Sequence, residues 1–256
     1  MQIIGEKING TRKRVAQAIA ERDANFIKKL ATKQAEAGVN WLDVNAGTHP
    51  NQEPDDLVWL VETVQSVVDT PLCLDIVNPA SLSAAFPVIN KTPMINSING
   101  EPERLERVLP IVAEHKCQVI ALAMDDKHVP ASGEKRMEII HKMMVETRAV
   151  GIPDSDVYID PLSMTVATNT NNALITLDTI RAIRQAYPDA HITMGLSNTS
   201  FGLPARSYIN RTFLTLAIQA GLDREIQAAI LTTELLLGQD RRCLNYVRAS
   251  RKGVFG

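Results

Sequence analysis

The sequence has little of what marks several classes of protein. Three cysteines in 256 residues are too few and too scattered for a disulfide framework, so a reducing compartment, the cytoplasm, is expected. With 27 basic and 29 acidic residues, the chain offers no electrostatic basis for binding nucleic acid or an anionic membrane. Its longest apolar run, residues 119–124, is far shorter than the roughly 20 residues of a membrane helix. Residues 1–10 contain Glu6 and Lys7 and no long apolar core, which argues against a signal peptide.

Common motifs for metals, nucleotides and nucleophilic catalysis are also missing. The five histidines are dispersed without H-x-H or H-x3-H spacing, so no metal site is predicted. Neither G-x-G-x-x-G nor G-x-S-x-G occurs. Gly5 and Gly10 have the spacing of a phosphate-binding loop, but Thr11 and Arg12 follow where that loop needs Lys and then Ser or Thr.

Short apolar runs alternate with longer amphipathic stretches along the chain. The runs, which are typical of strands buried on both faces, are residues 3–4, 41–42, 72–74, 93–95, 119–124, 157–159 and 192–196. Helical spacing occurs in residues 12–37, 55–68, 101–115, 132–150, 172–186, 205–220 and 228–249. This alternation predicts parallel strands joined by right-handed crossovers. Seven units and a partly visible eighth favour a single-domain α/β fold over residues 1–256, a (β/α)8 TIM barrel, with an open doubly wound sheet as the alternative.

Short polar side chains follow five of the predicted strands. They are Asp43 with Asn45, Asp75, Asn96, Asp160, and Ser197 with Asn198. In a barrel these positions all face the C-terminal mouth, where active sites form. One such residue alone is more often a helix cap or a turn former, but five together favour a convergent polar site. Carboxylates suit a ligand edge with two adjacent N–H donors, which favours a pterin or guanine-like ring over a phosphate.

Six ordered segments of the sequence resemble the pterin-binding methyltransferase family. They are Gly5-Glu6-Lys7-Ile8-Asn9-Gly10, Leu42-Asp43-Val44-Asn45, Leu72-Cys73-Leu74-Asp75, Met94-Ile95-Asn96-Ser97, Tyr158-Ile159-Asp160-Pro161-Leu162 and Gly195-Leu196-Ser197-Asn198. Within that family the resemblance is to the methyltetrahydrofolate:corrinoid protein methyltransferases. Residues 195–214 are also similar to the folate domain of cobalamin-dependent methionine synthase.

The resemblance implies a (β/α)8 barrel, usually a homodimer, that holds tetrahydrofolate or 5-methyltetrahydrofolate in its C-terminal mouth. It implies methyl transfer between N5 of the folate and the cobalt of a corrinoid (cobalamin) carried by a partner protein, with the direction left open. The positions that it assigns to the site are Asp75, Asn96, Asp160, Asn198, Arg206, Asp43 and Asn9. The first three would hold the pterin ring, Asn198 would act at N5 as the catalytic residue, and Arg206 would contact the substrate.

The sequence leaves two alternative functions, and it departs from the family pattern in one place. A dihydropteroate synthase-like enzyme and a non-catalytic folate-binding subunit are the alternatives. After Gly221 the segment that should form strand eight looks roughly ten residues short, against usual strand-to-helix loops of ~2–6 residues. Either the barrel closes differently in this chain, or a loop is absent from the sequence.

Overall fold

The computed structural model describes residues 2–125 and 129–222. The chain divides into two compact units, each described by itself. Of the described residues, 2–121 and 143–157 form the N-terminal unit, and 122–125, 129–142 and 158–222 form the C-terminal unit. Among the described residues, no helix has both the length and the apolar character needed to cross a membrane.

Parallel strands form the centre of the N-terminal unit. They are β1 (Ile4–Asn9), β2 (Trp41–Asn45), β3 (Leu72–Asp75), β4 (Met94–Ile98) and β5 (Gln118–Leu122), and they pair in chain order. Asn45 is the register partner of Asp75, and Asp75 is the partner of Asn96. The polar residues near the carboxyl ends of β2, β3 and β4 therefore lie at one edge of the sheet.

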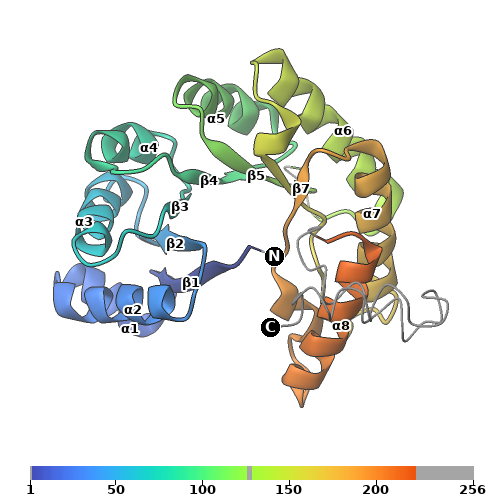
Figure 1. Ribbon diagram of the computed structural model, residues 1–256, viewed down its shortest axis with the longest axis horizontal. Coiled ribbons are helices and arrows are strands. Elements are labelled where there is room, and N and C mark those ends of the chain that lie inside the picture. Colours follow the sequence, from blue (N-terminus) through green and yellow to red (C-terminus); the bar gives the residue numbers. More distant parts are fainter. Residues whose placement is uncertain (1, 126–128, 223–256) are drawn as a thin grey trace, which may run out of the picture. The chain divides into compact units, whose positions relative to one another are not determined.

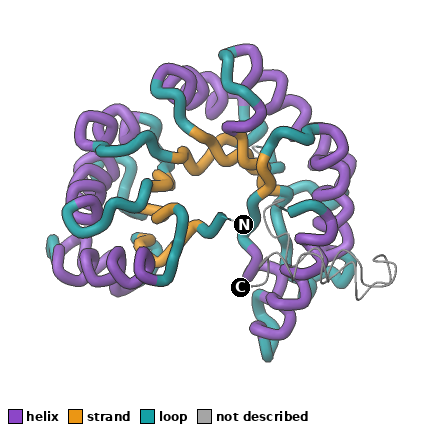
Figure 2. Tube along the Cα trace, viewed as in Figure 1, coloured by secondary structure: helices purple, strands orange, loops and turns teal. Residues whose placement is uncertain are grey.

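Helices cover one face of these strands (Figures 1 and 2). They are α1 (Lys13–Ala20), α2 (Ala24–Glu36), α3 (Glu53–Gln65), α4 (Ala80–Ala85), the 3-10 turn η1 (Phe86–Val88) and α5 (Pro102–Glu114). Leu42, Leu74 and Ile95 of the strands are fully buried, as are Ile27 and Leu57 of the helices. Burial of successive strand residues explains why the strands have continuous apolar runs in the sequence.

The C-terminal unit repeats the strand-and-helix pattern. Its elements are the first part of α6 (Gly133–Ala149), β6 (Val157–Asp160), α7 (Asn172–Ala186), β7 (His191–Ile192), the 3-10 helix η3 (Leu196–Ser200) and α8 (Arg206–Ala220). A further 3-10 turn, η2 (Asp154–Asp156), precedes β6. Strands β6 and β7 are parallel, with Tyr158 opposite His191.

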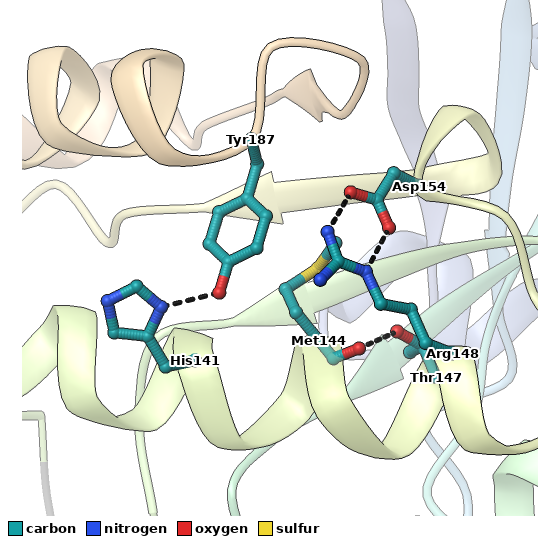
Figure 3. A network of polar contacts seen from close by, with 6 residues as sticks. All are labelled: His141, Met144, Thr147, Arg148, Asp154 and Tyr187. Carbon is teal, nitrogen blue, oxygen red and sulfur yellow. Dashed lines mark hydrogen bonds and ion pairs between the residues drawn. The ribbon is translucent and has the colours of Figure 1, made fainter.

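Polar contacts fasten both parts of α6 to the segments beside them (Figure 3). The hydroxyl of Tyr187, at the end of α7, is hydrogen-bonded to Nδ1 of His141. Near the end of α6, the Arg148 guanidinium donates to both carboxylate oxygens of Asp154, at 2.8 and 2.6 Å. The two-pronged contact fixes η2, which leads directly into β6.

The parallel α/β prediction is confirmed, with differences in detail. Residues 12–37 form two helices because Arg22 adopts a left-handed conformation (φ 54°) and Asp23 caps α2 by accepting from Phe26 N at 3.1 Å. The short helix α4 was not predicted, and residues 5–9 belong to β1 instead of a following loop. The predicted strand eight and the helix over residues 228–249 lie outside the described residues, so closure of an eight-stranded barrel is not shown.

Gly10 allows the ends of β1 and β2 to meet. A Cβ atom at this position would lie 1.8 Å from the carbonyl oxygen of Ala46. The Gly10 amide donates to Asn45 O at 2.8 Å. Any side chain at residue 10 would therefore separate Asn9 from the end of β2.

Candidate active site

Strands β1 to β4 bring a cluster of polar side chains together. We call Glu6, Asp43, Asn45, Asp75 and Asn96 the carboxylate cluster. The Asn45 amide donates to Asp75 Oδ2 at 2.6 Å, and the Asn96 amide donates to Asp43 Oδ2 at 3.1 Å. Each amide thus fixes a carboxylate on another strand.

The three carboxylates of this cluster all have raised pKa values, chiefly because of burial. Asp43 is 2% exposed, and burial followed by the charge of Asp75 raises its pKa to about 7, while the hydrogen bond from Asn96 opposes the rise. Burial also raises the pKa of Asp75, against the hydrogen bond from Asn45. The pKa of Glu6 is raised by burial of its carboxyl group and then by Asp75. Near neutral pH the cluster therefore shares at least part of a proton and offers hydrogen-bond acceptors together with a donor.

A buried glutamate shapes the loop that follows Asp75. Glu53, 2% exposed at the start of α3, accepts from the amides of Val77 and Asn78 at 2.9 and 2.7 Å. It also accepts from the Ser81 hydroxyl at 2.8 Å. One carboxylate thus satisfies three donors and holds the loop between β3 and α4 in place.

In the C-terminal unit, Asp160 ends β6 as predicted. Its Oδ1 accepts from the amide of Leu162 at 2.7 Å. The buried guanidinium of Arg136 donates to the carbonyls of Pro161 and Leu162, at 2.8 and 2.7 Å, and to Pro130 O at 3.1 Å. Arg136, on α6, therefore fixes the backbone of Leu162, the residue whose amide donates to Asp160.

Asn198 is not at the end of a strand, so that part of the sequence prediction is wrong. β7 contains only His191–Ile192, and the ladder ends where the amide of Thr193 donates to Ile159 O at 3.0 Å. The chain then turns into η3, where Asn198 is exposed and its backbone amide donates to Gly195 O at 3.0 Å. The side chain of Asn198 is therefore on the part of η3 that faces solvent, whereas Thr199 and Ser200 are buried.

The loop after β6 holds η3 in position. The hydroxyls of Ser163 and Thr199 are hydrogen-bonded, and the amide of Val166 donates to Thr199 O at 2.9 Å. The Thr165 hydroxyl also donates to Phe201 O at 2.6 Å. The segments that carry Asp160 and Asn198 are therefore joined by side-chain and backbone hydrogen bonds.

Arg206 contacts η3 through its guanidinium. It donates to Ser197 O at 2.7 Å and to Ser200 Oγ at 3.0 Å, while the Ser200 hydroxyl donates to Asn210 at 2.7 Å. These contacts tie η3 to the start of α8. A contact between Arg206 and the substrate stays a prediction.

Asn9 stabilises the turn after β1. Its Oδ1 accepts from the Thr11 amide at 2.9 Å and from the Thr11 hydroxyl at 2.5 Å. The carboxamide oxygen is thus engaged within the chain, and a role of Asn9 in binding stays a prediction.

The structure brings Asp43, Asp75 and Asn96 together in the N-terminal unit. Asp160, Asn198 and Arg206 belong to the C-terminal unit. Sequence reasoning missed Glu6 and Glu53, although both are acidic residues beside a predicted strand or helix start. Within the described residues, no group of three or more His, Cys, Asp or Glu side chains is placed to hold a metal ion.

Comparison with known proteins identifies the family. Residues 5–226 match the model of the family described as pterin binding enzyme. A methylcorrinoid:tetrahydrofolate methyltransferase from Eubacterium limosum is 40% identical over 266 aligned positions, which cover 100% of this chain and 98% of that protein. The alignment is longer than this 256-residue chain, so the relative has residues that this chain lacks.

More distant relatives agree with this assignment. Methionine synthase from Mycobacterium tuberculosis is 30% identical over 237 residues, which cover 88% of this chain and 20% of that protein. Dihydropteroate synthases share the fold at low identity. The enzyme from Xanthomonas albilineans has a TM-score of 0.62 at 17% identity, covering 94% of this chain and 93% of that one. The enzyme from Coxiella burnetii has a TM-score of 0.65 at 15% identity, covering 91% of each chain.

The family resemblance predicted from the six sequence segments is thus confirmed over the whole chain. The chain belongs to the pterin-binding enzyme family and, within it, groups with the methyltransferases that act between corrinoids and tetrahydrofolate.

Proposed function

We propose that this chain is a methyltransferase that moves a methyl group between N5 of tetrahydrofolate and the cobalt of a corrinoid protein. The observation that carries the proposal is the 40% identity, over both full lengths, to a methylcorrinoid:tetrahydrofolate methyltransferase. The carboxylate cluster supports it, because buried or half-buried carboxylates and amides at one sheet edge suit the N–H donors and carbonyl of a pterin ring.

The residues divide into ring-holding groups and one group at the reacting nitrogen. Asp75, Asn96 and Asp160 would orient the pterin, so that an encounter between two molecules becomes an oriented displacement. Asn198 would hydrogen-bond N5, where charge changes as the methyl bond forms or breaks. Its amide can donate or accept, so it can serve in either direction.

When the methyl group moves to the folate, the carbon–cobalt bond breaks as the carbon–N5 bond forms. The electron pair stays with the corrinoid, and N5 loses its proton. The carboxylate cluster is a candidate proton acceptor or relay, since the pKa values of Asp43 and Asp75 are both raised.

The domain organisation, oligomeric state and location of the protein are part of the same proposal. We propose one pterin-binding (β/α)8 domain over residues 1–256, a homodimer in the cytoplasm, and a role in one-carbon metabolism. Sequence similarity to a full-length relative supports the single domain, and the near-neutral net charge of −2 supports a partner other than nucleic acid or membrane.

Dihydropteroate synthase-like condensation is less well supported. Those enzymes share the fold at 15–17% identity, far below the identity to the methyltransferase. A non-catalytic folate-binding subunit would bind the pterin without turnover, which the experiment below distinguishes.

The test is a visible-spectrum assay of cobalamin with wild type and Asn198→Ala. Protein is mixed with methylcobalamin and tetrahydrofolate, and separately with cob(I)alamin and 5-methyltetrahydrofolate. We expect protein-dependent methyl transfer in wild type and a loss of about 100-fold in the variant, because one hydrogen bond to the developing charge is removed.

Calorimetry with tetrahydrofolate is the companion measurement. The dissociation constant of Asn198→Ala should stay within about threefold of wild type, since a group that acts in the transition state contributes little to ground-state binding. Equal losses of rate and affinity would make Asn198 a binding residue only. Folate binding by wild type without methyl transfer in either mixture would favour the non-catalytic subunit.

A further inference from the structure

Arg104, in the first turn of α5, binds three backbone carbonyls. Its Nε donates to Ser97 O at 2.9 Å, Nη1 donates to Val77 O at 2.8 Å, and Nη2 donates to Ile76 O at 2.9 Å. All three distances are those of good charge-assisted hydrogen bonds. The guanidinium is therefore committed to the backbone of this chain.

The carbonyls that Arg104 binds come directly after two residues of the carboxylate cluster. Ile76 and Val77 follow Asp75, and Ser97 follows Asn96. Asp75 and Asn96 are register partners on β3 and β4, and the Ile76 amide donates to Asn96 O at 3.0 Å. Arg104 thus bridges the segment that leaves β3 to β4, at the residue next to Asn96.

Arg104 is partly buried, and acidic side chains near it favour its positive charge. Burial lowers its pKa, while the charges of Glu53, Asp75 and Glu101 oppose that shift. In return, the positive charge of Arg104 lowers the pKa of Asp75, which burial and Glu53 raise. A planar guanidinium with its donors in one fork can reach three carbonyls at once, whereas a lysine ammonium acts as a point charge.

We propose that Arg104 is a positioning residue that fixes the spacing of Asp75 and Asn96 and thereby sets how tightly the pterin is held. This inference rests on the proposed function, because it names the pterin as the ligand of those two residues. Sites of this kind need their groups held to within a fraction of an ångström, so a loosened strand end weakens ligand binding.

Arg107 provides a matched control on the same helix. It lines the same groove of 380 Å³ as Arg104, together with Val77, Ser97 and Glu103. Its guanidinium is exposed and pairs with the exposed Glu103 at 3.1 Å. Arg107→Gln therefore removes an arginine from α5 without removing a hydrogen bond to the ends of β3 and β4.

The first measurement is amide hydrogen exchange in the absence of folate, on wild type, Arg104→Gln, Arg104→Lys and Arg107→Gln. We expect faster exchange in residues 75–79 and 96–99 of Arg104→Gln, a smaller change in Arg104→Lys, and wild-type exchange in Arg107→Gln. Unchanged protection of both segments in Arg104→Gln overturns the proposal, whether or not the protein binds folate.

The second measurement is the dissociation constant of tetrahydrofolate as a function of pH. Arg104→Gln should bind about tenfold more weakly or worse at neutral pH, because the two ligand residues are no longer held. The charged and titratable groups that act on Asp75 are Glu53 and Arg104, and Asp75 in turn acts on Glu6 and Asp43. Loss of Arg104 raises the pKa of Asp75, so affinity should begin to fall at a higher pH as the solution is acidified.

The two proposals fail in different ways. If wild type does not bind tetrahydrofolate, the proposed function fails, and hydrogen exchange alone decides the role of Arg104. If wild type binds and Arg104→Gln binds equally well with the same pH profile, Arg104 is not a positioning residue. If Arg104→Gln does not fold, Arg104→Lys is compared with Arg107→Gln, and equal affinity and pH profile in those two variants overturn the proposal.

Discussion

At the scale of single residues, Asp43 shows how burial and neighbouring charge shape the site. Its carboxyl group is 2% exposed, beside Asp75 and Glu6, and its pKa is raised to about 7. Asp43 on β2 is the register partner of the buried Cys73 on β3, and the Cys73 thiol opposes part of the rise in the pKa of Asp43. In the sequence Asp43 is only a polar residue at the end of a predicted strand, whereas in the folded chain its carboxyl group has a pKa near neutral pH.

Asp43→Asn should stabilise the protein, and more so at high pH. In wild type the unfolded chain ionises Asp43 above its usual pKa of 3.8, whereas the folded chain keeps the proton until about pH 7. The stability of wild type therefore falls as pH rises through this window, and the full penalty, at most about 4 kcal/mol, is present above it. Urea unfolding at pH 5 and pH 8 measures the difference between variant and wild type. An equal difference at both values would contradict the raised pKa.

Gly195→Ala tests whether the orientation of Asn198 matters. The backbone at residue 195 has φ −73°, which alanine accepts, but a Cβ atom there would lie 2.8 Å from Asn198 Nδ2. The substitution should displace the amide and slow methyl transfer by about tenfold, with thermal stability preserved.

The control for this prediction is a double-mutant cycle. In an Asn198→Ala background, Gly195→Ala should have no further effect on the rate, since the group that it displaces is gone. Additive losses would show that Gly195 acts through something other than Asn198.

At the scale of elements, sequence patterns predicted the strand ends better than the turns between elements. Asp75 and Asp160 end their strands as predicted, because a buried apolar run stops where the chain reaches the polar edge. Asn198 was misplaced because residues 192–196 stay mostly apolar after the ladder has ended. The break before α2 had no Gly or Pro to mark it, and depends on the conformation of Arg22 and the cap from Asp23.

The sequence does not show which arginines support the site. Arg104 and Arg136 lie on helices, where an arginine usually faces water. Their partners are backbone carbonyls of distant loops, such as Ser97 and Leu162, and a carbonyl is present at every residue. Only the tertiary structure shows which carbonyls a helical guanidinium reaches.

Glu53→Gln should loosen the loop between β3 and α4. The carboxylate accepts from the amides of Val77 and Asn78 and from the Ser81 hydroxyl, and an amide group would place a donor against one of these donors. We expect a loss of about 2–3 kcal/mol in the free energy of unfolding, measured in urea, because a buried donor is left unsatisfied.

The matched variant is Glu103→Gln on α5. Glu103 is exposed and pairs only with the exposed Arg107 in the contacts described for it, so its loss should change stability by less than about 0.5 kcal/mol. Similar losses in both variants would show that Glu53 contributes no more than a surface charge.

At the scale of the whole molecule, the predicted ligand residues come from both units. Asp43, Asp75 and Asn96 lie in the N-terminal unit, and Asp160 and Asn198 lie in the C-terminal unit. Under the single-domain proposal the two units fold together, and a ligand stabilises whatever must be folded to bind it. The single-domain proposal therefore predicts one cooperative unfolding transition.

Thermal unfolding followed with two probes tests this coupling. The chain has two tryptophans, Trp41 and Trp59, and both lie in the N-terminal unit, so their fluorescence reports that unit alone. Far-ultraviolet circular dichroism reports the helices of both units. We expect the two transitions to coincide and to rise together by about 5–10 °C at a tetrahydrofolate concentration of about 100 times its dissociation constant. Separate transitions, with only the fluorescence transition moved by folate, would mean that the N-terminal unit binds the ligand without Asp160 and Asn198.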